Sequence, residues 1–327
     1  MIEEREAEFL SPRAQLSVKS AGRERQEEDS SIRTCYQRDR DRIVHCKSFR
    51  RLKHKTQVFL SPEGDHYRTR LTHTLEVDQV ARTIARALSL NEDLTEAIAL
   101  GHDLGHSPFG HTGEDAWQPP HTLRPFEHNA QSVRVARVLE KDGAGLNLTR
   151  EVLDGILTHV EELVPATLEG KVVRLADRIA YINHDIDDAV RARVLTEAEL
   201  PADLIAVLGQ TGRERINNLV MDMIENSIDG EDIRMSQPMY DAMEAMKEFL
   251  FKNVYVGSAA KVEESKAVNV LRQLYAYYAE RPGELPREPH GDKPDQETMI
   301  IDYLAGMTDR YALREYVQLF MPNAWEG

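Results

Sequence analysis

The sequence contains few of the residues that staple small secreted proteins together. Cys35 and Cys46 are its only cysteines among 327 residues, which excludes a disulfide framework, and their spacing is not that of a zinc site. A transmembrane helix needs about 18 consecutive apolar residues, and no apolar run in the sequence is that long. The N-terminus, MIEEREAEFLSPRAQ, is charged and lacks the apolar stretch of a secretory signal. We therefore expect a cytoplasmic protein without a membrane partner.

Positive charge is also scarce. The chain has 41 lysines and arginines against 56 aspartates and glutamates, and its net charge of −15 argues against nucleic acid or anionic membranes as the main partner. Nine of the cations lie in residues 33–55, which hold only two acidic residues. This basic segment is either a solvated helix face or a phosphate-binding surface. Its arginines from Arg33 to Arg42 could equally serve a subunit interface or a second nucleotide site.

Apolar residues recur at helical spacing from about residue 38 onward, and no alternating β pattern competes with them. We therefore predict an all-α fold, a helical bundle with additional C-terminal helices. Its parts are a polar N-terminal arm at residues 1–30, a core at residues 31–200 and a helical C-terminal part at residues 201–327. Four prolines predict a loop at residues 281–297 within this last part.

Histidine is concentrated in one part of the chain. Seven of the 12 histidines lie within 63 residues, and three of these lie in ALGHDLGHSPFGHTGED, residues 99–115. Two imidazoles and two carboxylates on three predicted helices form a mixed nitrogen and oxygen ligand set: His73, His102, Asp103 and Asp177. Such a set suits a divalent metal ion and leaves positions for water and substrate.

The order of these residues resembles that of the HD-domain metal-dependent phosphohydrolases. GHDLGHSPFGHTGE, residues 101–114, is similar to the signature of one branch, the deoxynucleoside triphosphate triphosphohydrolases or deoxyguanosinetriphosphatase-like proteins. Five more stretches match this branch in order: DRDRI to SFRRLKHKTQV (39–58), RTRLTHTLEV (68–77), FEHNAQS (126–132), RLADRIAY (174–181) and DYLAGMTDRYA (302–312). Together the matches cover the chain from about residue 30 to residue 320.

The resemblance implies an HD-domain bundle that binds a divalent metal ion through His73, His102, Asp103 and Asp177. Mn, Mg, Fe, Co and Zn all accept this ligand set, so the sequence leaves the metal's identity open. The resemblance also implies a homo-oligomer. It leaves open a regulatory dNTP and weak binding of single-stranded nucleic acid.

His111 and Glu114 are implied as the catalytic pair, with His128 as a third polar group near the phosphates. A phosphate ester needs a polarised phosphorus, a positioned water and a proton for the leaving oxygen. His111 would supply that proton, and Glu114 would fix its tautomer. For His106, in the same motif, we favour a structural role in the loop. We assign surface or packing positions to three other histidines: His66, His121 and His159.

The implied substrate contacts are Arg51, Gln57, Arg70, Tyr181 and Asp185. Arg51 and Arg70 would contact the phosphates, with Gln57 close to them. Tyr181 and Asp185 are four residues apart and lie on one face of a predicted helix with a metal ligand. The resemblance implies that Tyr181 stacks on the sugar where a 2′-hydroxyl would stand, and that Asp185 contacts the 3′-hydroxyl.

We therefore expect hydrolysis of deoxynucleoside triphosphates, either dGTP or several dNTPs, to deoxynucleoside and inorganic triphosphate, with water attacking the α-phosphorus. One alternative is an HD-type nucleoside monophosphatase or phosphodiesterase, which the same metal ligands would serve. Another is a regulator that binds a nucleotide or single-stranded nucleic acid. The pair His111 and Glu114 and the basic RRLKHKTQV stretch favour triphosphates over the first alternative. Intact metal ligands and the intact pair count against the second, although the arginine-rich segment leaves a secondary binding role open.

Overall fold

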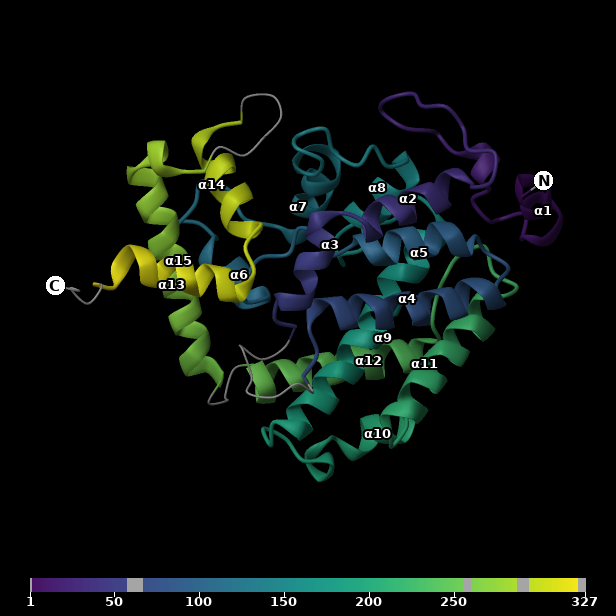
Figure 1. Cartoon of the computed structure of the whole chain (residues 1–327). Coiled ribbons are helices and arrows are strands. Elements are labelled where there is room, and N and C mark those ends of the chain that lie inside the picture. The colour runs from purple at the N-terminus through teal and green to yellow at the C-terminus, as the bar shows by residue number, and fades with distance from the viewer. Residues whose placement is uncertain (1, 58–66, 256–259, 287–293, 323–327) are drawn as a thin grey trace. The chain divides into compact units, whose positions relative to one another are not determined.

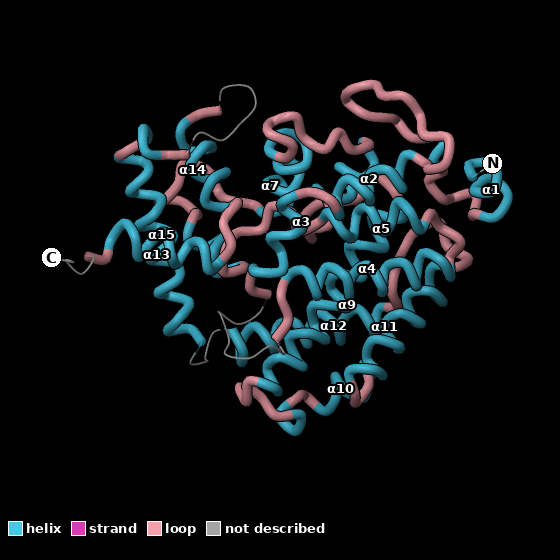
Figure 2. Tube along the Cα trace, viewed as in Figure 1, coloured by secondary structure: helices cyan, strands magenta, loops and turns pink. Residues whose placement is uncertain are grey.

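The computed structural model describes residues 2–57, 67–255, 260–286 and 294–322, and within these ranges the chain is helical (Figure 1). This part of the chain holds isolated β-bridges but no strand, so the all-α prediction is confirmed (Figure 2). None of the described helices is long and apolar enough to cross a membrane. The proline-rich loop predicted at residues 281–297 lies partly outside the described residues.

The α-helices are α1 (Ile2–Phe9), α2 (Cys35–Val44), α3 (Lys47–Arg51), α4 (Arg70–Ala87), α5 (Glu92–Gly101), α6 (His111–Ala116), α7 (His128–Arg134), α8 (Arg150–Leu157), α9 (Leu168–Arg191), α10 (Ala202–Leu208), α11 (Gly212–Ser227), α12 (Gln237–Leu250), α13 (Ala260–Glu280), α14 (Gln296–Ala305) and α15 (Asp309–Phe320). Short 3-10 or π turns are η1 (Ser17–Lys19), η2 (Leu52–His54), η3 (Val135–Leu139), η4 (Glu197–Glu199), η5 (Phe251–Tyr255) and η6 (Pro282–Glu284).

The chain forms two compact units, each assembled from three separated segments. The first unit comprises residues 1–45, 72–102 and 147–258, and the second comprises residues 46–71, 103–146 and 259–327. These units do not coincide with the stretches 31–200 and 201–327 predicted from the sequence. The reason is that residues 46–71 and 103–146 pack with the C-terminal helices rather than with their neighbours in the chain.

Helix α9 is the centre of the first unit and packs against α5, α8, α11 and α12. It begins after Thr167, whose hydroxyl accepts a hydrogen bond from a backbone N–H of the first turn. Helix α5 begins after Asn91, whose side chain accepts a hydrogen bond from the backbone N–H of Leu94 in the same way. Gly101 ends α5 where a Cβ atom would lie 2.6 Å from Ile156 Cδ1 of α8, so a larger residue there would require the Ile156 side chain to shift.

The N-terminal arm is bound to the first unit. The buried Glu6 carboxylate accepts hydrogen bonds from the backbone N–H and hydroxyl of Ser17 at 2.8 and 2.7 Å. The backbone N–H of Gln15 donates to Glu169 of α9 at 3.0 Å. Residues of the predicted arm therefore help to fix the start of α9.

The arginines of residues 33–42 are neutralised within the same unit. Arg38 and Arg42 both pair with Glu27, and Arg33 pairs with Asp41 at 2.9 Å. The Arg42 hydrogen bond, aided by that of Asn147, outweighs the opposing effect of burial and lowers the pKa of Glu27 to about 2. This half of the basic segment thus has its counter-charges inside the unit.

The second unit has its apolar core around α13, which packs against α6, α14 and α15. Fully buried Trp117 follows α6 and stacks edge-on against Phe126, with ring centroids 5.2 Å apart. Leu271 of α13 and Leu304 of α14 complete this core, and Phe109 enters it from the histidine-rich loop. Burying each leucine stabilises the unit by roughly 1.5–3 kcal/mol. The loop that carries the predicted catalytic residues is thereby fixed to a packed core.

Candidate functional site

Three of the four predicted metal ligands lie together in the first unit. His73 is in α4, His102 follows α5 and Asp177 is in α9. The Nε2 atoms of His73 and His102 lie 3.0 and 3.9 Å from the same Asp177 oxygen, and the two rings are 5.6 Å apart. Two imidazole nitrogens and a carboxylate oxygen that converge in this way form a donor set that fits a divalent metal ion.

Backbone contacts orient one of these rings. The Nδ1 atom of His102 lies 2.7 Å from the carbonyl oxygen of Ala99, so Nδ1 carries the proton and Nε2 keeps its lone pair on the Asp177 side. Burial alone would raise the pKa of Asp177, but the hydrogen bond with His73 and the charges of His102 and His159 lower this pKa below the usual range. Asp177 is therefore an ionised carboxylate at neutral pH.

A second layer of hydrogen bonds holds His73. Its Nδ1 atom lies 3.3 Å from Nδ1 of His184, a buried residue of α9. The Nε2 atom of His184 lies 2.7 Å from the Glu76 carboxylate. Because that carboxylate can only accept, His184 donates through Nε2. A neutral His184 would then accept at Nδ1 and keep the His73 ring oriented if a metal ion replaced the Nε2 proton that His73 shares with Asp177.

The sequence reasoning missed these supporting residues. It gave no role to Glu76 and His184, and it placed His159 among surface or packing positions; His159 lies beside His102 with ring centroids 5.1 Å apart. A signal was present for two of them. Glu76 is one helical turn after His73, and His184 is two turns after Asp177, so both lie on the faces of α4 and α9 that carry ligands.

Asp103, the fourth predicted ligand, follows His102 directly in the chain and belongs to the second unit. There its carboxylate accepts a hydrogen bond from Arg70 Nη1 at 2.8 Å, and both side chains are buried. Arg70 was predicted to contact phosphate. In the structure, Arg70 forms an ion pair with the predicted metal ligand Asp103. A contact between Arg70 and phosphate stays a prediction.

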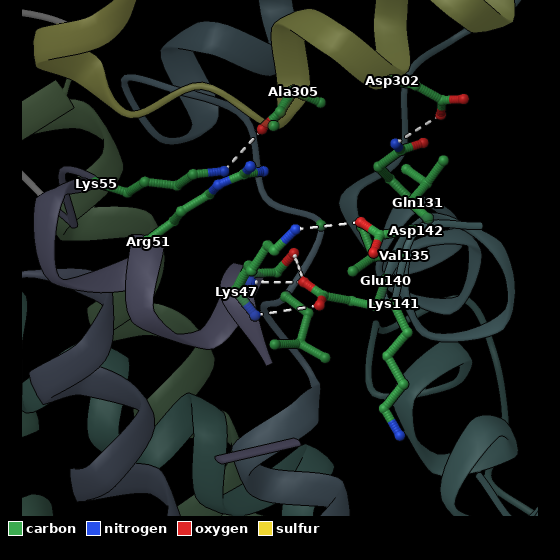
Figure 3. Close-up of a pocket in the computed structure, with 15 residues that line it drawn as sticks. Lys47, Arg51, Lys55, Gln131, Val135, Glu140, Lys141, Asp142, Asp302 and Ala305 are labelled. Carbon is green, nitrogen blue, oxygen red and sulfur yellow. Dashed lines mark hydrogen bonds and ion pairs between the residues drawn. The ribbon is translucent and has the colours of Figure 1, made fainter. Parts of the chain in front are cut away.

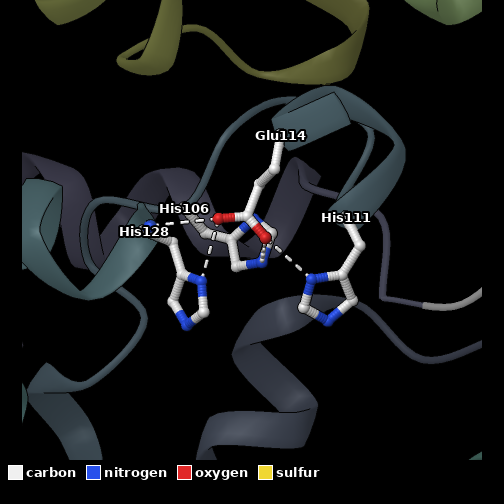
Figure 4. Close-up of side chains that lie close together, drawn as sticks. All are labelled: His106, His111, Glu114 and His128. Carbon is white, nitrogen blue, oxygen red and sulfur yellow. Dashed lines mark hydrogen bonds and ion pairs between the residues drawn. The ribbon is translucent and has the colours of Figure 1, made fainter. Parts of the chain in front are cut away.

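The second unit gathers the predicted catalytic residues around one carboxylate (Figure 4). Glu114 Oε2 lies 2.8 Å from His111 Nδ1, while Oε1 lies 2.9 Å from His128 Nδ1 and accepts the His128 backbone N–H at 3.0 Å. His106 completes this histidine cluster, since its ring stacks on His128 with centroids 4.7 Å apart. Ligand atoms of the four residues lie within 4.8 Å of one another, a spacing that would also permit a metal ion.

Three members of the cluster have shifted pKa values, which are lowered for Glu114 and His106 and raised for His128. Burial alone would raise the pKa of Glu114, but the charge of His128 and the hydrogen bonds from His111 and His128 hold it well below its usual range. Burial would lower the pKa of His128, and the Glu114 carboxylate overcomes this effect and raises it. Burial and the charge of Arg70 keep the pKa of His106 well below its usual value. The cluster therefore holds an ionised Glu114, a neutral His106 and a His128 that retains its proton to higher pH.

Exposure distinguishes His111 from its neighbours. Its side chain is 60% exposed, whereas that of Glu114 is 14% exposed and His106 is fully buried. With Nδ1 bound to Glu114, the other ring nitrogen of His111 can face a substrate. His106, for which a structural role was favoured, is the buried member of the cluster, and its Nδ1 atom is 3.4 Å from the Ser107 carbonyl oxygen.

The loop before α6 takes its shape from close backbone contacts. Gly110 has φ +64°, a conformation that L side chains rarely adopt, and a Cβ atom there would lie 3.3 Å from Arg70. At Gly113 a Cβ atom would lie 1.9 Å from the Pro108 carbonyl oxygen. Asp309, in the C-terminal DYLAGMTDRYA stretch, accepts the Phe109 backbone N–H at 2.9 Å. That distant motif thus fixes the histidine-rich loop.

The predicted substrate contacts fall into three places. Tyr181 and Asp185 lie on α9 with Asp177, in the first unit, where Tyr181 is partly exposed and Asp185 is buried. Gln57 is buried in the second unit, and its backbone lies near Gly110. Arg51 lines a separate cavity of that unit, and the lining includes no member of the histidine cluster (Figure 3). His121 is exposed as predicted, and His66 lies outside the described residues.

Two family profiles match the chain. The HD domain matches residues 70–182, which include all four predicted metal ligands and the histidine cluster. The phosphohydrolase-associated domain matches residues 233–318, which include Asp309.

Three relatives that match nearly the whole chain are each named deoxyguanosinetriphosphate triphosphohydrolase-like protein. One from Caldanaerobacter subterraneus subsp. tengcongensis is 56% identical over 99% of this chain and 96% of the relative. One from Clostridium perfringens is 51% identical over 98% of this chain and 97% of the relative. One from Ralstonia nicotianae is 41% identical over 95% and 94% of the two chains.

Proposed function

The chain belongs to the family of deoxyguanosinetriphosphate triphosphohydrolase-like proteins, which carry the HD domain, and from this membership we propose that it is a deoxynucleoside triphosphate triphosphohydrolase. Its products would be a deoxynucleoside and inorganic triphosphate. The observation that carries the proposal is the shared carboxylate of Glu114, which orients an exposed His111 while it is itself fixed by His128.

The proposed metal ligands are His73, His102, Asp103 and Asp177. The convergence of the first, second and fourth in one unit, and the position of Asp103 next to His102 in the chain, support this set. A bound divalent ion would supply positive charge to the phosphates and lower the pKa of a coordinated water. Mn, Mg, Fe, Co and Zn are all compatible with these ligands.

The chain's own residues would manage the proton. As water attacks the α-phosphorus, negative charge develops on the departing 5′-oxygen, and a protonated imidazole close to it stabilises that charge. We assign this role to His111, because its Nδ1 is held by Glu114 and its Nε2 can face the substrate. His128 would hold Glu114 in place and add positive charge near the phosphates.

The remaining contacts are assigned by position. We propose that Tyr181 packs on the deoxyribose and that Asp185 binds its 3′-hydroxyl, since both lie on α9 one and two turns after Asp177. Gln57 and Arg70 would approach the phosphates from beside Gly110. The homo-oligomer, the regulatory dNTP and the weak binding of single-stranded nucleic acid stay predictions. The internal pairing of the arginines at residues 33–42 argues against them as a nucleic-acid surface.

The test compares two histidine variants that differ only in position. Purified full-length chain, stripped of metal and then supplied with Mn²⁺ or Mg²⁺, is incubated with each dNTP and with GTP. Chromatography then separates nucleoside, mono- and diphosphate. We expect metal-dependent release of deoxynucleoside by the wild type and by His121→Ala, which changes an exposed histidine outside the cluster. His111→Ala should lose at least about 10²-fold in kcat. Normal turnover by His111→Ala would disprove the acid role.

A further inference from the structure

The second unit contains a cavity of about 220 Å³ behind the histidine-rich loop (Figure 3). Its walls come from four parts of the chain. Lys47 and Arg51 lie on α3, with Lys55 just beyond, Gly105 belongs to the loop, residues 131–142 run from α7 past η3, and Gly306 follows α14. The residue roles proposed above use none of these walls, and the phosphate contact predicted for Arg51 from the sequence stays a prediction.

The acidic residues of this lining already have donors. The Glu140 carboxylate accepts both the backbone N–H and the hydroxyl of Ser48 at 2.7 Å. Asp302 accepts hydrogen bonds from the Arg134 guanidinium at 2.6 Å. Asp142 lies at the rim, where its 88% exposed side chain faces Lys47 at 3.4 Å. The negative charges in the wall are therefore compensated before any ligand binds.

The two inner cations have no such compensation. Throughout the described parts of the chain, no carboxylate lies within ion-pair distance of Arg51 or Lys55. The Arg51 guanidinium packs against Gly306, where a Cβ atom would lie 3.1 Å from Nη1. The buried Lys55 ammonium donates only to backbone carbonyl oxygens, those of His106 and of Ala305, the latter at 2.7 Å. Both side chains extend toward Ala305 (Figure 3).

Burial beside another cation disfavours the charged form of Lys55. Burial, and then the charge of Arg51, lower the pKa of Lys55 to about 7, although Asp309 and Asp103 oppose the shift. Arg70 also faces this ammonium with like charge. An anion between Arg51 and Lys55 would offset the repulsion between these two cations, and a guanidinium binds phosphate oxygens in pairs.

We propose that this cavity binds a small phosphate-type oxyanion, either inorganic phosphate or a short polyphosphate, between Arg51 and Lys55. The size of the cavity sets the ligand class. Pockets for drug-sized ligands occupy roughly 300–1,000 Å³, so about 220 Å³ suits an inorganic anion better than a whole nucleotide. The proposal does not depend on the proposed triphosphohydrolase activity.

Lys55 connects this anion site with the histidine cluster. The same ammonium that would contact the anion donates to the His106 carbonyl oxygen, and the His106 ring stacks on His128. An anion would compete with that carbonyl for the Lys55 protons. Occupancy of the cavity is therefore expected to shift the position of His106 and, through it, that of His128.

The test is binding of inorganic phosphate to the metal-free full-length chain at low ionic strength, measured by calorimetry, with tripolyphosphate as a second arm. We expect saturable binding at one site that falls at least tenfold in Arg51→Gln. The matched control is Arg50→Gln, which removes a neighbouring exposed cation of α3 outside the cavity lining. Binding should persist in Arg50→Gln and also in His111→Ala, which alters the histidine cluster. A preference for tripolyphosphate would identify a short polyphosphate as the ligand, and equal affinity would favour free phosphate.

Three results would overturn the proposal: no saturable binding by the wild type, equal losses in Arg50→Gln and Arg51→Gln, or loss of binding in His111→Ala. A measurement without any variant guards against misfolding of Arg51→Gln. Lysine side-chain NMR of the wild type should show one lysine that titrates near pH 7 and moves to higher pH when phosphate is added. A titration that phosphate does not move would also overturn the proposal.

Discussion

Replacing Glu114 by Gln should separate proton handling from metal binding. The Glu114 carboxylate accepts hydrogen bonds from His111 and His128 at 2.8 and 2.9 Å, and it gives the only described negative charge that both rings contact directly. A glutamine has nearly the same shape but no charge, and its amide offers one accepting oxygen where the carboxylate has two. One histidine would therefore face an N–H₂ group instead of an acceptor.

The expected magnitude follows from these contacts. A hydrogen bond to a charged group contributes about 1.5–3 kcal/mol, and two of them depend on this carboxylate. Each 1.36 kcal/mol corresponds to a tenfold change in rate, so kcat should fall on the order of 10²–10⁴-fold. The metal content should not change, because His73, His102 and Asp177 make their contacts in the other unit.

The assay is steady-state hydrolysis of a dNTP together with metal analysis of the same sample. Glu127→Gln is the matched control, since Glu127 is exposed, precedes His128 and carries the same charge. We expect the control to keep its kcat within about threefold of the wild type. The assignment of Glu114 would be refuted by a variant that keeps wild-type kcat, or by one that loses its metal along with its activity.

The remaining predictions concern the metal ligands and the pH dependence. Asp177→Asn should lose both bound Mn²⁺ and activity, because a charged donor is removed from the ligand set, and metal analysis that finds full occupancy would contradict its assignment. His184→Ala and Glu76→Gln should each weaken Mn²⁺ affinity by about 10–100-fold in calorimetry, because each removes a hydrogen bond that orients the His73 ring. Unchanged affinity would show that His184 and Glu76 do not support the metal ligand. The pKa of His128 is raised on folding, so its stabilising contribution is complete below pH 6.5 and is lost as pH rises through the higher folded value. Urea unfolding of His128→Gln should accordingly differ most from the wild type at acidic to neutral pH, and a difference that grows at alkaline pH would refute the raised pKa.

Much of the site was predictable because its chemistry lies in short motifs. His102 and Asp103 are adjacent, and His111 and Glu114 are one helical turn apart, so their spacing alone brings them close. The Asn91 cap and the helical period of α9 were equally local signals. Local patterns of this kind predict helices and the residues that lie on one face of each helix.

Contacts between distant segments could not be predicted in this way. Asp309 accepts hydrogen bonds from the backbones of Thr56 and Phe109, residues about 250 and 200 positions earlier, and no sequence period encodes such a pairing. The same limit explains the missed role of His184, whose partner Glu76 lies on another helix. The same limit applies to the pairing of the basic segment, residues 33–55. Only the fold shows that Arg38 has its counter-charge in Glu27, whereas Arg51 has none among the described residues.

The most direct test of the central claim is hydrolysis of dGTP in H₂¹⁸O by the metal-loaded chain, with mass spectrometry of both products. Attack of water on the α-phosphorus places one ¹⁸O atom in inorganic triphosphate and none in deoxyguanosine. Label in the deoxynucleoside would instead mean attack at the sugar carbon. Release of monophosphate, pyrophosphate or orthophosphate as the first product would contradict triphosphohydrolase activity itself.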